Sequence, residues 1–140
     1  MTETETLNLL HDFGGDGPLL HLAHANGFPP GTYRLLAEVL TERYHVIALP
    51  SRPLWPGSRP EEAPSWRVLA DDLVEGLDRL SADGLIGVGH SLGGVLTLWA
   101  ALARPTLLRA VVLVDPVILP PAWLWAVRLM RALGWQQRQP

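Results

Sequence analysis

The chain has 140 residues, of which 48% are hydrophobic and 18% charged, a balance typical of a globular domain and not of a disordered segment. The net charge is −3 with no dense basic patch, which argues against nucleic-acid binding, and the absence of cysteine excludes disulfides, thiol chemistry and cysteine-based metal sites. The length suits one domain with one core, although doubly wound and barrel-type α/β domains commonly need roughly 200–250 residues.

The first fifty residues predict two strands, a helix and a third, short strand. Apolar segments at residues 7–13 and 19–23 have the length of strands, and the glycine-rich residues 14–18 predict a turn between them. Residues 32–43 predict a helix, and residues 46–49 predict a short strand. The apolar residues expected on one face of this helix are Leu35, Leu36, Val39 and Leu40.

The middle of the chain predicts a loop followed by a helix. Residues 50–64 are rich in proline and indicate a surface loop. Residues 65–80 have a helical period, with Ser65 as the expected N-cap. The side chains expected to form its buried stripe are Leu69, Leu73, Leu77 and Leu80.

The remaining elements continue the alternation of strands and helices. Residues 85–88 predict a buried strand, a helix then begins at Ser91 and ends before Pro105, and residues 110–114 predict a further strand. Because helices separate the strands, we expect βαβ crossovers, and therefore a largely parallel sheet with helices on both faces.

Residues 84–103 contain no charged side chain and are long enough to cross a bilayer as one helix. Their glycines cluster where a strand, a turn and a helix would need them, so we favour a buried strand and helix over a membrane span. The polar, acidic residues 1–5 do not resemble a signal peptide, and we expect a cytoplasmic protein.

The most informative motif is Gly89-His90-Ser91-Leu92-Gly93, a G-x-S-x-G sequence between the predicted strand and helix. A sharp turn at this place lifts a serine hydroxyl to the top of a sheet, where a substrate can reach it. Side chains at positions 89 and 93 would collide with the neighbouring turn, which explains the two glycines. The N–H of Leu92, at the start of the helix, could bind a developing oxyanion.

A second motif, His24-Ala25-Asn26-Gly27-Phe28-Pro29, follows the strand predicted at residues 19–23. With the first motif it resembles the α/β-hydrolase family, in which an H-G-x loop after an early strand supplies the second oxyanion amide. Two registers fit: Asn26 supplies the amide if His24-Ala25 is the H-G pair, and Phe28 supplies it if Asn26-Gly27 is. We favour Phe28 by a small margin, because Gly27 would allow a close backbone approach.

The resemblance runs from about residue 6 to residue 125 and includes residues 111–116, which look like the family's next strand with its acid and proline. It implies an α/β-hydrolase-like fold truncated after about six strands. Residues 1–120 would then form the N-terminal part of the core, and residues 121–140 would begin the lid. The tryptophan-rich segment 120–135 is either a lid helix lining an acyl pocket or a helix packed on the sheet.

The chemistry that this resemblance implies is esterase-like acyl transfer to water. Ser91 would attack the carbonyl of a small ester-like substrate, and Leu92 with Phe28 or Asn26 would stabilise the oxyanion. No cofactor or metal is implied. Dehalogenases and epoxide hydrolases of the family carry aspartate where this chain has Ser91, which disfavours their chemistry.

A serine nucleophile needs a general base, and the family's catalytic histidine falls beyond residue 140. The five histidines of this chain do not occupy that position. The side chain of His90 should point away from that of Ser91, and His24 is better explained as a hydrogen-bonded loop or core histidine. Asp115 is a candidate catalytic acid; the alternative is that it anchors the turn at Pro116. We therefore expect weak activity or none from this chain alone.

The alternative is a non-catalytic fragment, a binding module or one half of a split hydrolase. Residues 110–114 would expose an unpaired apolar sheet edge, which commonly pairs with another chain. We expect this strand to bind a second copy or a complementary C-terminal half, or to cause aggregation. We expect no membrane partner.

Overall fold

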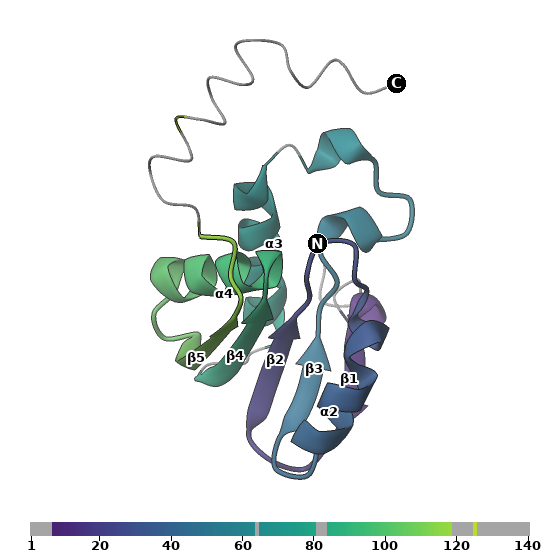
Figure 1. The fold of residues 1–140 in the computed structure, drawn as a ribbon, viewed down its shortest axis with the longest axis vertical. Coiled ribbons are helices and arrows are strands. Elements are labelled where there is room, and N and C mark those ends of the chain that lie inside the picture. The colour runs from purple at the N-terminus through teal and green to yellow at the C-terminus, as the bar shows by residue number, and fades with distance from the viewer. Residues whose placement is uncertain (1–6, 64, 81–83, 119–124, 126–140) are drawn as a thin grey trace.

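The computed structural model describes residues 7–63, 65–80, 84–118 and 125 (Figure 1). Its strands are β1 (His11–Gly14), β2 (Leu19–Ala23), β3 (His45–Ala48), β4 (Leu85–His90) and β5 (Leu108–Val114). Its α-helices are α2 (Arg34–Leu40), α3 (Trp66–Arg79) and α4 (Leu92–Ala103), with 3-10 turns η1 (Pro30–Tyr33), η2 (Arg52–Leu54) and η3 (Pro60–Glu62). The helix expected over residues 120–135 lies outside the described residues apart from Trp125, so the domain boundary at residue 120 stays a prediction.

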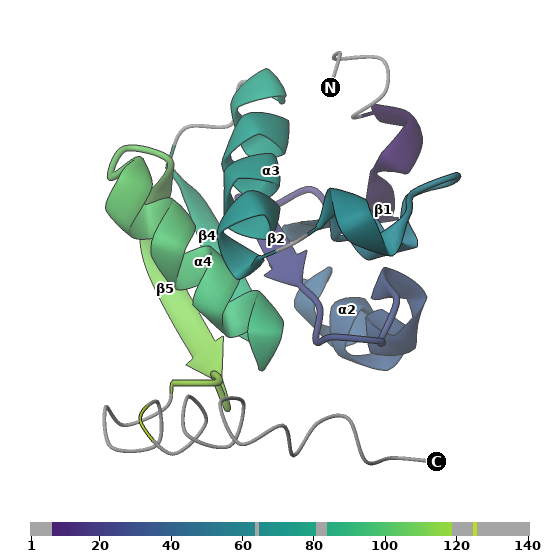
Figure 2. The same cartoon turned by 90° about the horizontal axis from the view of Figure 1, so that it is seen from above.

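The strands form one sheet in the order β1-β3-β2-β4-β5. β3, β2, β4 and β5 are parallel, and only β1 runs antiparallel to its neighbour. Helices α3 and α4 cover one face and α2 lies on the other (Figure 2). This architecture confirms the predicted fold class, with five strands in the described part of the chain where about six were expected.

The first predicted strand is partly wrong. Residues 7–9 are helical, and strand β1 begins only at His11. A hydrogen bond from the Leu10 N–H to the Leu7 carbonyl (3.3 Å) closes a turn there. The turn lets Leu10 pack against the core cluster beneath α3, and this long-range burial outweighs the strand pattern of the segment.

Helix α2 also differs from the helix predicted at residues 32–43. Segment 32–43 divides into η1 and the shorter α2, and Ala37 is the buried residue of α2. Tyr33, Ala37 and Leu40 contact the core beneath the helix, at a spacing that puts them on one side of it. The expected stripe is therefore mostly exposed, with exposed fractions of 71% for Leu35, 46% for Leu36 and 64% for Val39.

Helix α3 packs as the sequence predicts. Leu69, Leu73 and Leu77 are buried, in one cluster with side chains of α4 and β5, and Leu80 is half-buried at the C-cap. Ser65 occupies the N-cap position with extended backbone, but its side chain makes no capping hydrogen bond. The helix therefore depends on its packed apolar stripe for stability, as most helices of globular proteins do.

Candidate functional site

Ser91 stands at the turn between β4 and α4 in a strained backbone conformation. Its φ is 52° and its ψ is −115°, a region that residues with a side chain rarely occupy. The Ser91 N–H donates to the carbonyl of Val114 at the end of β5 (2.9 Å), and its own carbonyl accepts from Gly94 (3.1 Å). These bonds hold the strained turn at the carboxyl edge of the parallel strands.

Gly89 and Gly93 lie where the backbone leaves no room for a side chain. A Cβ on Gly89 would lie 2.5 Å from the Gly93 carbonyl oxygen. A Cβ on Gly93 would overlap the Ala23 carbonyl and lie 2.6 Å from the carbonyl oxygen of His24. The first turn of α4 therefore packs directly on the end of β2, which brings the loop after β2 beside the N–H of Leu92.

The loop after β2 is held by its own hydrogen bonds. The Phe28 N–H donates to the Ala25 carbonyl (3.1 Å), and the Phe28 side chain is half exposed. Gly27 has a φ of 75°, and a Cβ there would meet no atom within 4 Å, so this glycine serves the turn and not a close approach. Among the described residues, no hydrogen bond uses the backbone N–H of Asn26.

Tyr33 connects this loop to β4. Its hydroxyl accepts from the buried Ala25 N–H (2.9 Å) and shares a hydrogen bond with Nδ1 of His90 (2.8 Å), and the Tyr33 and His90 rings meet edge to face. The imidazole of His90 is thus turned toward α2 and η1. No local sequence pattern indicates this role of Tyr33, because its partners are 8 and 57 residues away along the chain.

A cavity of about 100 Å³ lies between the loop after β2 and the start of α4. Residues of the loop after β2 and of α4 line it together with apolar side chains of η2 and α3. Its lining residues are His24, Asn26, Gly27, Ser51, Pro53, Leu54, Leu69 and Leu92. A cavity of this size has room for a small group beside Asn26 and Leu92.

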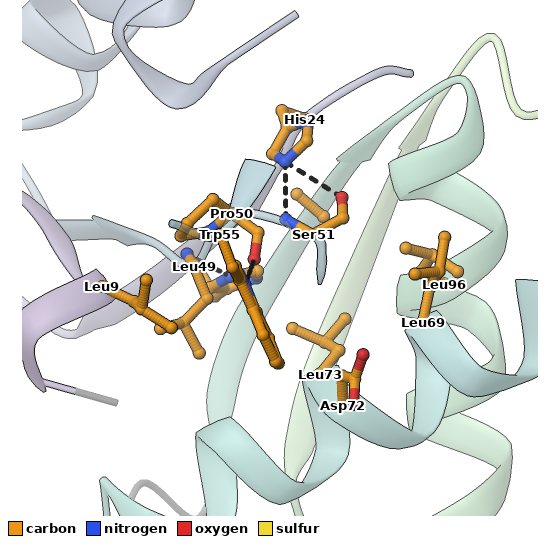
Figure 3. Close-up of a pocket in the computed structure, with 12 residues that line it drawn as sticks. Leu9, His24, Leu49, Pro50, Ser51, Trp55, Leu69, Asp72, Leu73 and Leu96 are labelled. Atoms are coloured by element: carbon orange, nitrogen blue, oxygen red, sulfur yellow. Dashed lines mark hydrogen bonds between the residues drawn. The ribbon is translucent and has the colours of Figure 1, made fainter. Parts of the chain in front are cut away.

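His24 is buried beside this cavity and is fully engaged in hydrogen bonds (Figure 3). Its Nε2 accepts from the Ser51 N–H (2.9 Å) and lies 3.0 Å from the Ser51 hydroxyl. Its Nδ1 therefore carries the proton and donates to the Ala25 carbonyl (2.8 Å). Burial lowers the pKa of His24, so this imidazole is neutral and its lone pair is occupied.

His21 is the most deeply buried histidine described, with 1% of its surface exposed. Its Nε2 accepts from the Leu49 N–H (3.1 Å), which joins β2 to the end of β3. Burial, with a smaller contribution from His24, lowers the pKa of His21 to about 3. Both histidines border a cavity of about 20 Å³, enough for roughly one water molecule. Trp55 and Leu73 also line it (Figure 3).

An ion pair that the sequence analysis missed fixes the loop above the site. Arg52 in η2 binds the buried carboxylate of Asp72 in α3 through two nitrogens, with Nε to Oδ2 at 2.8 Å. Its guanidinium lies 5.1 Å from the ring of Trp55, whose Nε1 donates to the Pro50 carbonyl (2.7 Å). An acid inside the apolar stripe of α3 was the sequence signal for a buried partner.

The candidate acid Asp115 is exposed and has a positive φ of 45°. It follows Val114, whose carbonyl accepts from the Ser91 N–H, so it leaves the sheet beside the serine. Elsewhere, His45 pairs with Asp12 (2.9 Å), and the rings of His11 and Phe13 meet at a tilt of 46°. In the described ranges, no hydrogen bond joins a histidine to Ser91.

The described residues contain no group of three or more histidine, aspartate or glutamate side chains placed to hold a metal ion. No helix among them combines the length and apolarity needed to cross a membrane.

Comparison with known proteins finds a consistent set of similarities. Residues 19–140 match the model of the alpha/beta hydrolase family. The chain is 32% identical to the 2-(acetamidomethylene)succinate hydrolase of Mesorhizobium japonicum over 72% of this chain and 36% of that protein. It is 30% identical to bifunctional epoxide hydrolase 2 of Mus musculus over 76% of this chain and 20% of that protein.

Solved structures agree with these similarities. A hydrolase from Pseudomonas aeruginosa superposes with a TM-score of 0.71 and 28% identity, over 89% of this chain and 48% of that one. The chain therefore spans less than half the length of each of these three proteins.

Proposed function

The chain belongs to the alpha/beta hydrolase family, and we propose that its site hydrolyses a small ester-like substrate with Ser91 as the nucleophile. The observation that carries this proposal is the strained conformation of Ser91, φ 52°, at the junction of β4 and α4. Strain of this kind persists only where surrounding structure maintains it, and it concentrates at active sites. Here Gly89, Gly93 and the bond to Val114 maintain it.

In the proposed reaction, the Ser91 hydroxyl oxygen adds to the carbonyl carbon of the ester while a base takes its proton. The carbonyl oxygen becomes an oxyanion, the alkoxide leaves with a proton, and water then cleaves the acyl-serine ester to release the acid. The oxyanion would accept hydrogen bonds from the N–H of Leu92 and a second amide. An oxyanion-hole donor of this kind is worth about 2.7–4 kcal/mol in other hydrolases.

We propose Asn26 as the source of the second amide, in place of the Phe28 favoured from the sequence. The Phe28 N–H already donates to the Ala25 carbonyl, and its release would break the turn. Asn26 lines the same small cavity as Leu92, and its N–H has no hydrogen-bond partner among the described residues. The apolar walls at Leu54 and Leu69 suit a short acyl group.

The general base is the component that the described histidines do not supply. The Nε2 lone pair of His24 is occupied by Ser51, and His90 is bound to Tyr33. In a catalytic triad the acid orients the base, so Asp115 could act in this way only where a base lies beside Ser91. This supports the alternative that the chain alone is non-catalytic, either a binding module or one half of a split hydrolase.

The test compares hydrolysis of p-nitrophenyl acetate by the purified chain and by Ser91→Ala. We expect a slow rate above the buffer rate, because Ser91 attacks without a positioned base, and we expect the substitution to lower it to the residual rate that the oxyanion amides and binding supply. Ser65→Ala is the matched control, because that serine is exposed and makes no capping bond. An unchanged rate in Ser91→Ala would overturn the role of this serine. Fast turnover that Ser91→Ala abolishes would instead show that the chain holds its own base.

A further inference from the structure

Ser51 brings a hydroxyl group to the cavity of about 100 Å³ beside Leu92. The other polar side chains among the described lining residues are the imidazole of His24 and the amide of Asn26. Asn26 is exposed, whereas His24 is buried and Ser51 is half-buried. The rest of the described lining offers apolar side chains or none, so these three polar groups decide which polar ligand the cavity accepts.

His24 has no hydrogen to give to the Ser51 hydroxyl. Its Nδ1–H donates to the Ala25 carbonyl (2.8 Å), so Nε2 carries only a lone pair. That lone pair accepts from the backbone N–H of Ser51 at 2.9 Å (Figure 3). The Ser51 hydroxyl lies 3.0 Å from the same nitrogen and competes with the N–H for one lone pair. Its hydrogen can therefore turn toward a ligand at little cost.

The backbone around Ser51 holds this hydroxyl in place. The Leu54 N–H donates to the Ser51 carbonyl (2.9 Å) at the start of η2, and the next residue, Arg52, is bound to Asp72 of α3. A group fixed in this way loses little conformational freedom when a ligand binds. Such a group can determine which ligand a mostly apolar pocket prefers.

The charges around the cavity favour a neutral ligand group. No arginine or lysine is among its described lining residues, and the guanidinium of Arg52 lies on the carboxylate of Asp72. The imidazole of His24 is neutral, because burial lowers its pKa. A carboxylate in this cavity would lose its hydration without a cation to replace it. The Ser51 hydroxyl therefore suits a neutral acceptor oxygen.

We propose that Ser51 determines substrate specificity: its hydroxyl donates to an ether or ketone oxygen of a short acyl group bound in this cavity. The inference rests on the proposed function, since the acyl group is that of the Ser91 substrate. The cavity has several times the roughly 10–15 Å³ that one water molecule needs, which leaves room for a short chain. The site then prefers an alkoxy or oxo acyl group to a plain alkyl group of the same size, because only the first accepts from the hydroxyl.

The probes for the test are 2-methoxyacetamide and butanamide, which differ only in an ether oxygen that replaces a methylene. Each is titrated into the chain, and binding is followed by NMR through the backbone amide signals of Asn26 and Leu92. We expect 2-methoxyacetamide to bind about three- to tenfold more tightly, the effect of one hydrogen bond. Ser51→Ala should bring the ratio of the two Kd values to about one, by weakening the binding of 2-methoxyacetamide.

Ser58→Ala is the matched control. Ser58 lies in the same proline-rich loop but is not among the residues that line the cavity, so its substitution should leave the ratio of the two Kd values unchanged. Ser51→Ala keeps the backbone N–H that donates to His24, and circular dichroism shows whether both variants keep the wild-type fold.

Three results would overturn the proposal: equal binding of the two probes by the wild-type chain, a preference that survives Ser51→Ala, or a preference that Ser58→Ala also removes. No binding of 2-methoxyacetamide at about 50 mM counts as the first result. That comparison uses the wild-type chain alone, so it decides the question even where a variant does not fold.

The test is separate from that of the nucleophile. Neither probe has to be attacked by Ser91, so Ser91→Ala should keep the preference for 2-methoxyacetamide. An intact preference together with ester hydrolysis that does not depend on Ser91 would overturn the role of that serine alone.

Discussion

The buried imidazole of His21 makes the stability of this protein sensitive to mild acid. Burial lowers its pKa to about 3 in the folded chain, whereas the pKa of a histidine in an unfolded chain is about 6.5. Below about pH 6.5 the unfolded chain therefore binds a proton that the folded chain does not. Stability from this group is complete above pH 6.5 and is lost progressively as the pH falls toward 3.

The size of the effect follows from the two pKa values. Each pKa unit between folded and unfolded chain is worth about 1.4 kcal/mol, so the whole loss is about 5 kcal/mol and is reached near pH 3. At pH 5 the loss is about 2 kcal/mol. That is a large share of the roughly 5–15 kcal/mol that stabilises a typical domain. The pKa of His24 is also lowered by burial, so this histidine contributes with the same sign.

The assay is urea unfolding at pH 7.5 and pH 5.0 for the wild-type chain and for His21→Gln. Glutamine keeps an acceptor for the Leu49 N–H but cannot take up the proton, so the variant should lose about 2 kcal/mol less than the wild type between the two pH values. Leu22→Met is the control, since Leu22 is equally buried in β2 and does not titrate. Equal losses in His21→Gln and wild type would refute the reasoning.

Two further predictions concern the polar contacts that shape the site. Tyr33→Phe removes the acceptor of the buried Ala25 N–H. We expect it to lower the free energy of unfolding, measured in urea, by about 1–3 kcal/mol. A loss below about 0.5 kcal/mol would contradict that role of Tyr33. Asp72→Asn leaves the Arg52 guanidinium without its carboxylate partner. We expect it to lower the free energy of unfolding by about 1–3 kcal/mol and to speed proteolysis of residues 50–57. Unchanged cleavage in those residues would show that the ion pair does not hold the loop.

Local sequence determines much of this fold. The strand, turn and helix around Ser91 are encoded within a short stretch, because an apolar run, closely spaced glycines and a second apolar run permit few other conformations. The stripe of Leu69, Leu73 and Leu77 likewise predicts its own burial, since its spacing puts the three side chains on one side of a helix. The order of these elements was enough to indicate a parallel sheet.

Tertiary structure decided what depends on partners distant in the sequence. Whether the stripe of α2 is buried depends on what covers it, and Ala37 contacts the core while Leu35 does not. The lone pair of His24 is occupied by Ser51, 27 residues away, and no local pattern reveals such a bond. The hydrogen bond from the Phe28 N–H to the Ala25 carbonyl, on which the proposal of Asn26 rests, is likewise not recorded by sequence patterns, because every residue except proline carries the same backbone group.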